Sequence, residues 1–215
     1  MLEARISKLR QLLLYMASIV EQMIRSSVKS LMERDEALAR QVIDECEPKV
    51  NDLEIKIDEM CINLLALYQP KASDLREITM VMKINNDLER LGDHAVNIAE
   101  RSVSLVGKPP VKPLIDIPRM ADIAVDMVRD SLNSFTSADA DLAVDVRSRD
   151  DFVDSLRDQI TRELVTYMIS DPSTLERALE LILIARDLER IADLATNIAE
   201  DVIFMVKGET VKHVW

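Results

Sequence analysis

The sequence predicts an all-α protein of two tandem antiparallel three-helix bundles that arose by internal duplication. Only 3 of the 215 residues are glycine and 3% are aromatic, whereas 48% are hydrophobic. A β-protein needs more glycine for its turns and more aromatic residues for its strands. Apolar residues recur instead at helical spacing in six long segments. Finally, residues 87–100 are repeated as residues 187–200, which indicates a duplicated unit.

The first bundle is expected in residues 1–106. Its three helices are predicted at about residues 5–32, 35–68 and 73–105. Asp35 is suited to cap the second of them. Pro48 lies within that second helix and has no N–H to donate, so it leaves the carbonyl of Asp44 without its partner. We therefore expect a kink or a break near Pro48.

A proline-rich linker, residues 107–117, separates the halves, because three prolines in seven residues cannot continue a helix. The second bundle is expected in residues 118–215. Its helices are predicted at about residues 118–135, 139–169 and 172–207. Asp171 followed by Pro172 is a strong helix start signal, and Gly208 is expected to end the last helix.

The composition argues against several classes of protein. The net charge of -12 is unsuited to binding a nucleic-acid backbone, which selects clusters of lysine and arginine. Cys46 and Cys61 on one helix would lie roughly 22 Å apart, too far for a disulfide. We see no membrane span and no signal peptide in the sequence. A reduced, cytoplasmic setting is therefore expected.

The repeated segment carries the strongest functional signal. Between Asp87 and Glu100, ten of fourteen positions match the second copy, and most of the ten are polar. Shared leucines reflect a shared packing need, whereas shared Asp, Glu, Arg and Asn suggest a shared site. On a helical wheel, Glu89 and Asp93 fall in phase with residues that should face the bundle. Partly buried acids at that spacing are costly unless they are protonated, paired or bound to a cation.

The second helix of each half offers a matching pair of oxygen-bearing residues. Facing pairs would form an oxygen-rich cluster that suits hard cations or carboxylate-bridged metals. The candidate metal ligands are Glu47 and Asn51 with Glu89 and Asp93, and Asp150 and Asp154 with Glu189 and Asp193. Glu100 and Glu200 are candidates for an outer shell of interactions.

The alternative is a purely structural helical interaction module, whose acidic faces are solvated or paired with Arg90 and Arg190. Asn97 suits a helix–helix hydrogen bond as well as it suits ligation. His94 has no counterpart in the second copy, which favours a surface or core histidine over a ligand. No nucleophile–base pairing is evident, so we do not expect an enzyme.

These motifs resemble the signature of the PhoU family of phosphate-uptake regulators, over essentially the whole chain. The matching motifs are Gln69-Pro70-x-Ala72-x-Asp74-Leu75-Arg76, and Asp87-Leu88-Glu89-Arg90-x-x-Asp93-x-x-x-Asn97-Ile98-Ala99 with its repeat. The resemblance implies multinuclear metal clusters held by the acids of the third and sixth helices. Iron or zinc is expected first, with magnesium or manganese as alternatives.

By position, Asp150 and Asp154 match the second-helix motif of the family, whereas Asn51 replaces an acid and Pro48 follows Glu47. The resemblance further implies a cytoplasmic regulator, peripheral at the inner face of the membrane. It would act as an adaptor between the phosphate ABC transporter and a sensor histidine kinase, restraining uptake and starvation signalling when phosphate is plentiful. A homodimer is left open.

Overall fold

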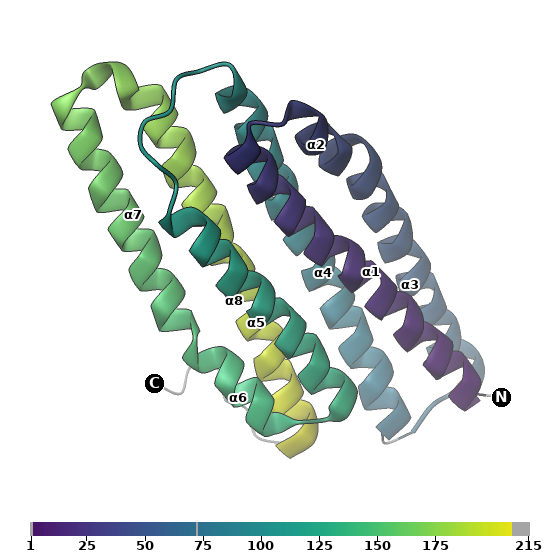
Figure 1. The fold of residues 1–215 in the computed structure, drawn as a ribbon. Helices are drawn as coiled ribbons and strands as arrows, with labels where there is room; N and C mark the ends of the chain where they lie inside the picture. Colours follow the sequence, from purple (N-terminus) through teal and green to yellow (C-terminus); the bar gives the residue numbers. More distant parts are fainter. Residues whose placement is uncertain (1, 72, 208–215) are drawn as a thin grey trace.

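The computed structural model describes residues 2–71 and 73–207, and nearly all of them are helical (Figure 1). The first half contains α1 (Leu2–Glu33), α2 (Glu36–Gln41), a π-helix (Val42–Cys46), α3 (Glu47–Tyr68) and α4 (Ser73–Val106). The second half contains α5 (Asp116–Ser137), α6 (Ala140–Ser148), α7 (Asp150–Ser170), a short 3-10 helix (Pro172–Thr174) and α8 (Leu175–Lys207). These residues include no strand, and the predicted fold class is confirmed.

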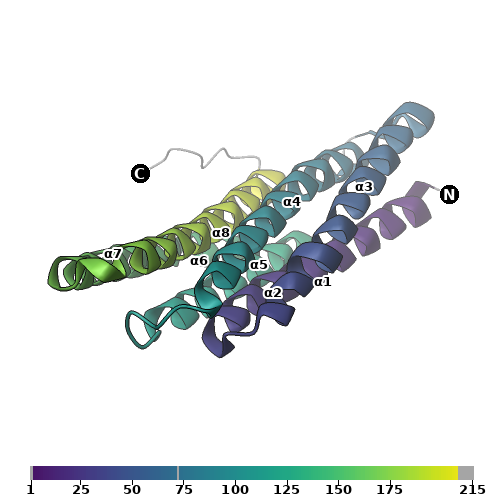
Figure 2. The ribbon, with the colours of Figure 1, turned by 90° about the horizontal axis from the view of Figure 1, so that it is seen from above.

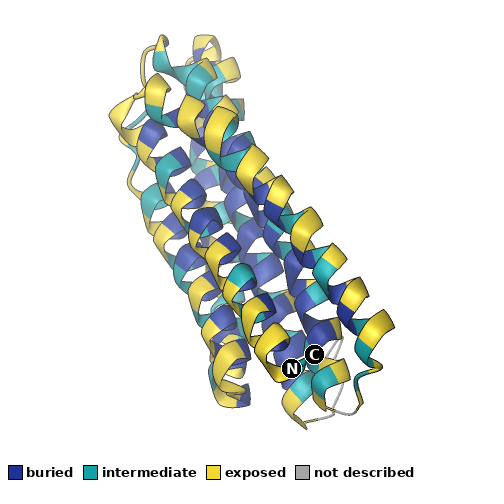
Figure 3. Ribbon diagram, turned by 90° about the vertical axis from the view of Figure 1, so that its right-hand side faces the viewer, coloured by how far each residue is buried: buried dark blue, intermediate teal, exposed yellow. Residues whose placement is uncertain are grey.

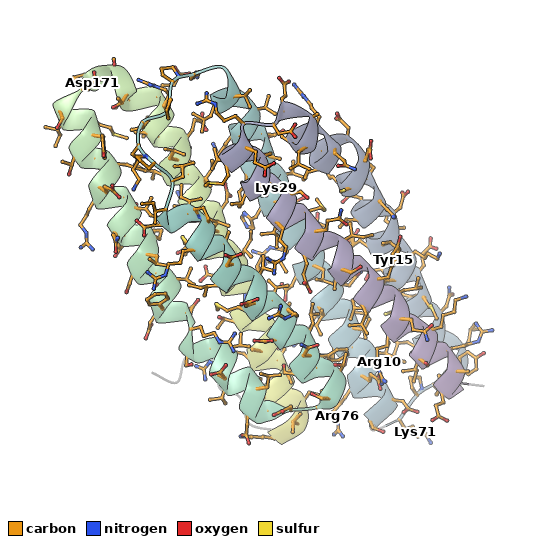
Figure 4. All side chains as sticks on the ribbon, in the orientation of Figure 1. Arg10, Tyr15, Lys29, Lys71, Arg76 and Asp171 are labelled. Atoms are coloured by element: carbon orange, nitrogen blue, oxygen red, sulfur yellow. The ribbon has the colours of Figure 1, made fainter. Side chains whose placement is uncertain are left out.

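The two halves lie side by side, with α4 of the first packed against α8 of the second and α1 against α5 (Figure 2). Contacts between α4 and α8 show that these helices run antiparallel. Near its start, Lys83 of α4 pairs with Asp201, late in α8, and further along α4 His94 pairs with Asp187. As a result, the connection near Lys71 and the connection near Asp171 lie at opposite ends of the molecule (Figure 4).

The core follows the predicted periodicity, with buried faces turned toward the helix interfaces (Figure 3). Equivalent apolar residues of the two repeat copies are fully buried or nearly so. They are Leu88, Leu91, Ala95 and Ile98 of α4, and Leu188, Ile191, Ala195 and Ile198 of α8. The shared apolar positions of the repeat therefore serve packing in both halves.

Each half bends directly before the first acid of its second-helix pair. In the first half, the π-helix Val42–Cys46 precedes α3, with Pro48 in the first turn, so the predicted kink is confirmed. In the second half, the continuous helix predicted over residues 139–169 is wrong. Arg149 separates α6 from α7, and its N–H donates to the carbonyl of Val146.

Ion pairs of Arg149 with Asp130 of α5 and with Asp145 accompany this break. No proline or glycine marks this break in the sequence. The predicted start signal at Asp171 is confirmed, because its side chain accepts a hydrogen bond from the N–H of Ser173 (3.0 Å). The expected stop at Gly208 lies outside the described residues.

Two other expectations concern the chain as a whole. Cys46 and Cys61 are both free. In the described part of the chain, no helix combines the length and the apolar character needed to cross a bilayer. The domain boundaries at residues 106 and 118 stay predictions, although α5 begins slightly earlier, at Asp116.

Candidate metal centres

The second half brings its four predicted acids together between α7 and α8. Asp150 and Asp154 of α7 face Glu189 and Asp193 of α8, and all four side chains are partly buried. Burial, and then the charges of Asp193 and Asp154, raise the pKa of Asp150 to about 6. The facing acid pairs inferred from the sequence are therefore neighbours in space.

Arginines partly neutralise this second-half cluster. Arg157 Nη1 lies 3.7 Å from Glu189 Oε1, and Arg157 Nη2 lies 3.4 Å from Asp154 Oδ1. Arg190 Nη1 lies 3.1 Å from Asp193 Oδ2. Even so, burial and the charge of Asp193 raise the pKa of Glu189 against these two arginines. The Oε2 atom of Glu189 is buried and accepts no hydrogen bond from the described residues.

The first half assembles a related cluster between α3 and α4. Burial, and then the charges of Asp93 and Glu100, raise the pKa of Glu47. Burial and the charges of Asp93 and Glu54 raise the pKa of Glu89, and Arg90 opposes this shift. Asp93 lies at the exposed edge of the cluster. The expected outer-shell residue Glu100 is close enough to act on Glu47, and Glu54 is an acid that the sequence pattern did not single out.

Asn51, the amide of the predicted first-half set, is exposed. A different amide, Asn85, is fully buried where α3 meets α4. Its Nδ2 donates to the carbonyl of Glu54 (3.0 Å) and to Asp58 Oδ1 (3.0 Å), while its Oδ1 has no hydrogen-bond partner within the described residues. Asn85 therefore fixes Glu54 beside Glu89, a role that the sequence analysis missed.

Other polar residues in and beside the repeat serve the contact between the halves. Asp187 of α8 is buried and lies 3.0 Å from His94 Nδ1. It also accepts hydrogen bonds from Asn97 Nδ2 (3.5 Å) and Arg101 Nε (3.3 Å). The helix–helix role of Asn97 is the alternative that the structure supports, and His94 is likewise an interface residue.

The donor chemistry of both clusters fits a cation bound by oxygen. Acids with raised pKa values favour a bound positive charge, and Glu189 Oε2 accepts no hydrogen bond within the described residues, although Arg190 Nε lies 3.7 Å from it. As the side chains lie, however, no three Asp, Glu, His or Cys residues of the described ranges converge on a single ion position. Direct ligation therefore requires side-chain rotation within each cluster.

Comparison with known proteins places this architecture in one family. The model of the PhoU domain matches residues 13–102 and again residues 117–202. A phosphate-specific transport system accessory protein PhoU homolog of Pseudomonas putida is 42% identical over 212 residues, covering 98% of this chain and 82% of the relative. The homolog of the same name from Aquifex aeolicus is 43% identical, covering 92% and 89%.

Solved structures agree with the sequence matches. The crystal structure of PhoU from Pseudomonas aeruginosa matches with a TM-score of 0.93 at 39% identity, covering 97% of this chain and 100% of that one. The phosphate transport system regulatory protein PhoU from Streptococcus pneumoniae matches with a TM-score of 0.90 at 25% identity, covering 99% and 100%. Two family matches within one chain, and relatives over nearly its whole length, mean that this protein belongs to the PhoU family.

Proposed function

We propose that this protein is a metal-binding regulator of phosphate uptake that acts without catalysis. The observation that carries the proposal is the pairing of partly buried acids across α3 and α4 and again across α7 and α8. In each half a cation would neutralise carboxylates that now raise one another's pKa, and would thereby fasten two helices together. Glu47, Glu89 and Asp93 would hold it in the first half, and Asp150, Asp154, Glu189 and Asp193 in the second.

The partner assignment rests on the family. The relatives are named accessory proteins of the phosphate-specific transport system, and we propose the same association for this chain. In this role it docks on the phosphate ABC transporter at the cytoplasmic side of the membrane and contacts a sensor histidine kinase. It restrains uptake and starvation signalling when phosphate is abundant. The strongly acidic surface, with a net charge of -12, agrees with protein partners rather than nucleic acid.

A purely structural role is the second candidate, and one observation favours it. In the second half, Arg157 and Arg190 already supply positive charge to three of the four acids. If these ion pairs satisfy the acids, no metal is needed there. The two candidates differ in what they predict for metal content and for the effect of a chelator on stability.

The test is elemental analysis of protein purified without chelator, together with melting curves before and after dialysis against EDTA. We expect bound metal in the wild type, loss of the first-half share in Glu89→Ala/Asp93→Ala, and loss of the second-half share in Glu189→Ala/Asp193→Ala. The matched control is Asp122→Ala/Asp126→Ala, an acid pair of the same spacing on α5 that pairs with Arg25. If the wild-type protein contains no metal and its melting temperature is the same with and without EDTA, the metal proposal is wrong and the purely structural role is favoured.

The regulatory part is tested separately, by co-purification with the membrane-embedded phosphate transporter. We expect the wild-type protein to be retained and the surface control variant to be retained equally. If the wild-type protein binds metal but is not retained by the transporter or the kinase, the adaptor role is refuted and the metal-binding proposal is unaffected.

A further inference from the structure

A pocket of about 200 Å³ lies where the linker crosses from one half to the other. Its walls come from the ends of α1 and α4, from linker residues 108–112 and Leu114, and from the start of α8. Figure 1 shows this linker between α4 and α5, at the end of the molecule where α7 joins α8. The pocket is thus remote from the acid rows in the middle of α4 and α8, and neither cluster contributes a residue to it.

The charge of this pocket is opposite to that of the protein. Four cationic side chains line it, Arg34, Lys108, Lys112 and Arg177, and no acidic residue is among its described lining. The whole chain carries a net charge of -12, so a purely positive lining is exceptional here. Lys112 is only 7% exposed and is paired with Glu163, while Lys108 Nζ lies 2.7 Å from Glu176 Oε1.

The two arginines are held by neutral groups. Arg34 donates to the carbonyls of Leu105 (3.0 Å) and Val106 (2.5 Å) at the end of α4, and to that of Lys108. Arg177 donates to the carbonyl of Pro109 (2.7 Å). Within residues 2–71 and 73–207 neither guanidinium lies at ion-pair distance from a carboxylate, although the charge of Arg177 adds to the lowering of the pKa values of Asp171 and Glu176. Carbonyls orient a guanidinium without cancelling its charge, and each guanidinium has five N–H donors.

The remaining wall is apolar. Leu31 of α1, Leu105 of α4, Val111 of the linker and Leu181 of α8 contribute to it. A pocket that combines an apolar wall with a few fixed polar groups is typical of small-molecule sites. A guanidinium matches the oxygens of a phosphate group, and two of them match its two negative charges.

We propose that this pocket binds a small organic phosphate monoester. Its phosphate group lies against Arg34 and Arg177, and its apolar body lies against Leu31 and Leu181. Such a ligand would join the end of α1 to the linker and to the start of α8, and so would tie the two halves together at this end. The proposal does not depend on metal binding at the acid clusters.

Isothermal titration of the full chain with phenyl phosphate, inorganic phosphate and phenol tests the proposal. We expect saturable binding of phenyl phosphate, at least about tenfold weaker binding of inorganic phosphate, and none of phenol, because both the charge and the apolar body contribute. Arg177→Gln should weaken phenyl phosphate at least about tenfold. The control Arg40→Gln, which removes an exposed arginine paired with Glu36 on α2, should not.

Methyl NMR of the wild-type protein provides a reading that is independent of any variant's folding. Phenyl phosphate should shift the methyl signals of Leu31, Val111 and Leu181 and leave those of Ile55 and Ile62, exposed on α3, in place. The proposal is overturned by an absence of saturable binding, by equal affinities in Arg177→Gln and Arg40→Gln, or by shifts spread over the surface. If inorganic phosphate binds as tightly as phenyl phosphate, the proposed contact of an apolar ligand body with Leu31 and Leu181 is refuted.

Discussion

The two acid clusters occupy equivalent places in the two halves but differ in composition, since Asn51 of the first half stands where the second has Asp154. Aligning the second helices so that Val50 matches Val153 puts Glu54 opposite Arg157. In the first half, the charge of Glu54 raises the pKa of Glu89. In the second half, Arg157 lies 3.7 Å from Glu189, and its charge opposes the rise that burial and Asp193 cause in the pKa of Glu189.

This difference shows that equivalent acids of the two repeat copies, Glu89 and Glu189, can have neighbours of opposite charge. The first cluster gathers Glu47, Glu54, Glu89 and Asp93, with Arg90 as its nearby cation, and depends most on an external positive charge. The second cluster contains its own cation, Arg157, and depends on an external one less. We therefore expect the first half to bind a cation more tightly than the second.

Exchanging the two charges should produce the largest effect. Glu54→Arg places a guanidinium in the first cluster and should weaken cation binding there by about two orders of magnitude, since an added positive charge both repels the ion and occupies the acids. Arg157→Glu should strengthen binding in the second cluster. Calorimetric titration of metal-free protein with Zn²⁺ and Mn²⁺ measures both, with Glu59→Arg, on the exposed side of α3, as the control. Unchanged affinity in Glu54→Arg would remove the proposed asymmetry.

Asn85→Ala gives the first half the residue that the second half has at the equivalent Ala185. The variant loses two hydrogen bonds that hold α3 on α4, and we expect it to lower the free energy of unfolding by about 1 to 2 kcal/mol. Urea unfolding followed by circular dichroism measures the loss. Asn86→Ala, the exposed neighbour, is the control. An identical urea midpoint for Asn85→Ala and wild type would show that the amide does not fasten these helices.

In metal-free protein, the acids of the second cluster should make the free energy of unfolding depend on pH. Asp150 has a pKa of about 6 in the folded chain, above its ordinary value of 3.8, so the folded state binds the extra proton between these values. Its contribution to stability is present below pH 4 and is lost as the pH rises through 6. After allowance for solvent screening at a partly exposed site, the loss is about 1 kcal/mol.

Asp150→Asn should remove that loss, and so flatten the stability profile between pH 4 and 6 and raise stability at pH 7. Urea unfolding in the presence of EDTA, at pH 4.5 and at pH 7, measures this difference in the free energy of unfolding. Asp52→Asn, at an exposed position of α3, should leave the profile as in wild type. A profile with the same slope in Asp150→Asn and wild type would contradict the assignment of the proton to Asp150.

The smallest effect is expected at the arginines beside each motif. Arg190→Gln removes pairs with Asp193 and Glu189, whereas Arg90→Gln removes a pair with Asp87. Both arginines are about half exposed, so each change should cost about 0.5 kcal/mol or less in thermal unfolding without metal. A loss several times larger at Arg190 would mean that the second cluster depends on this ion pair more than on Arg157.

Much of the fold and part of the candidate site could be predicted from local pattern. Apolar spacing located the six long helices, and Pro48 located the bend in the first half, because these signals act within a few residues. The break at Arg149 could not be predicted, since it has no proline or glycine and is accompanied by an ion pair with Asp130 on another helix. The clustering of Asp150 with Asp193 followed from the duplication and from helical phase.

The sequence alone could not predict that some acids of the repeat join the two halves while others form the acid clusters. Asp187 and Glu189 are two residues apart and therefore point to different sides of α8. The wheel separates these sides but does not say which neighbour covers each. The structure shows that Asp187 meets His94 and Arg101 of the other half, while Glu189 meets Arg157 of its own half. Tertiary packing alone assigns the two carboxylates to different roles.

The pairing of α4 with α8 has a consequence for any partner. These helices span 34 and 33 residues without interruption, each roughly 50 Å long, and ionic contacts at Lys83, His94 and Arg101 join them along much of that length. Each helix bears acids of its own half, so the spacing between the two acid sites is set by two uninterrupted helices that pack against each other. A protein that engages both sites at once must present its own complementary groups at that fixed separation.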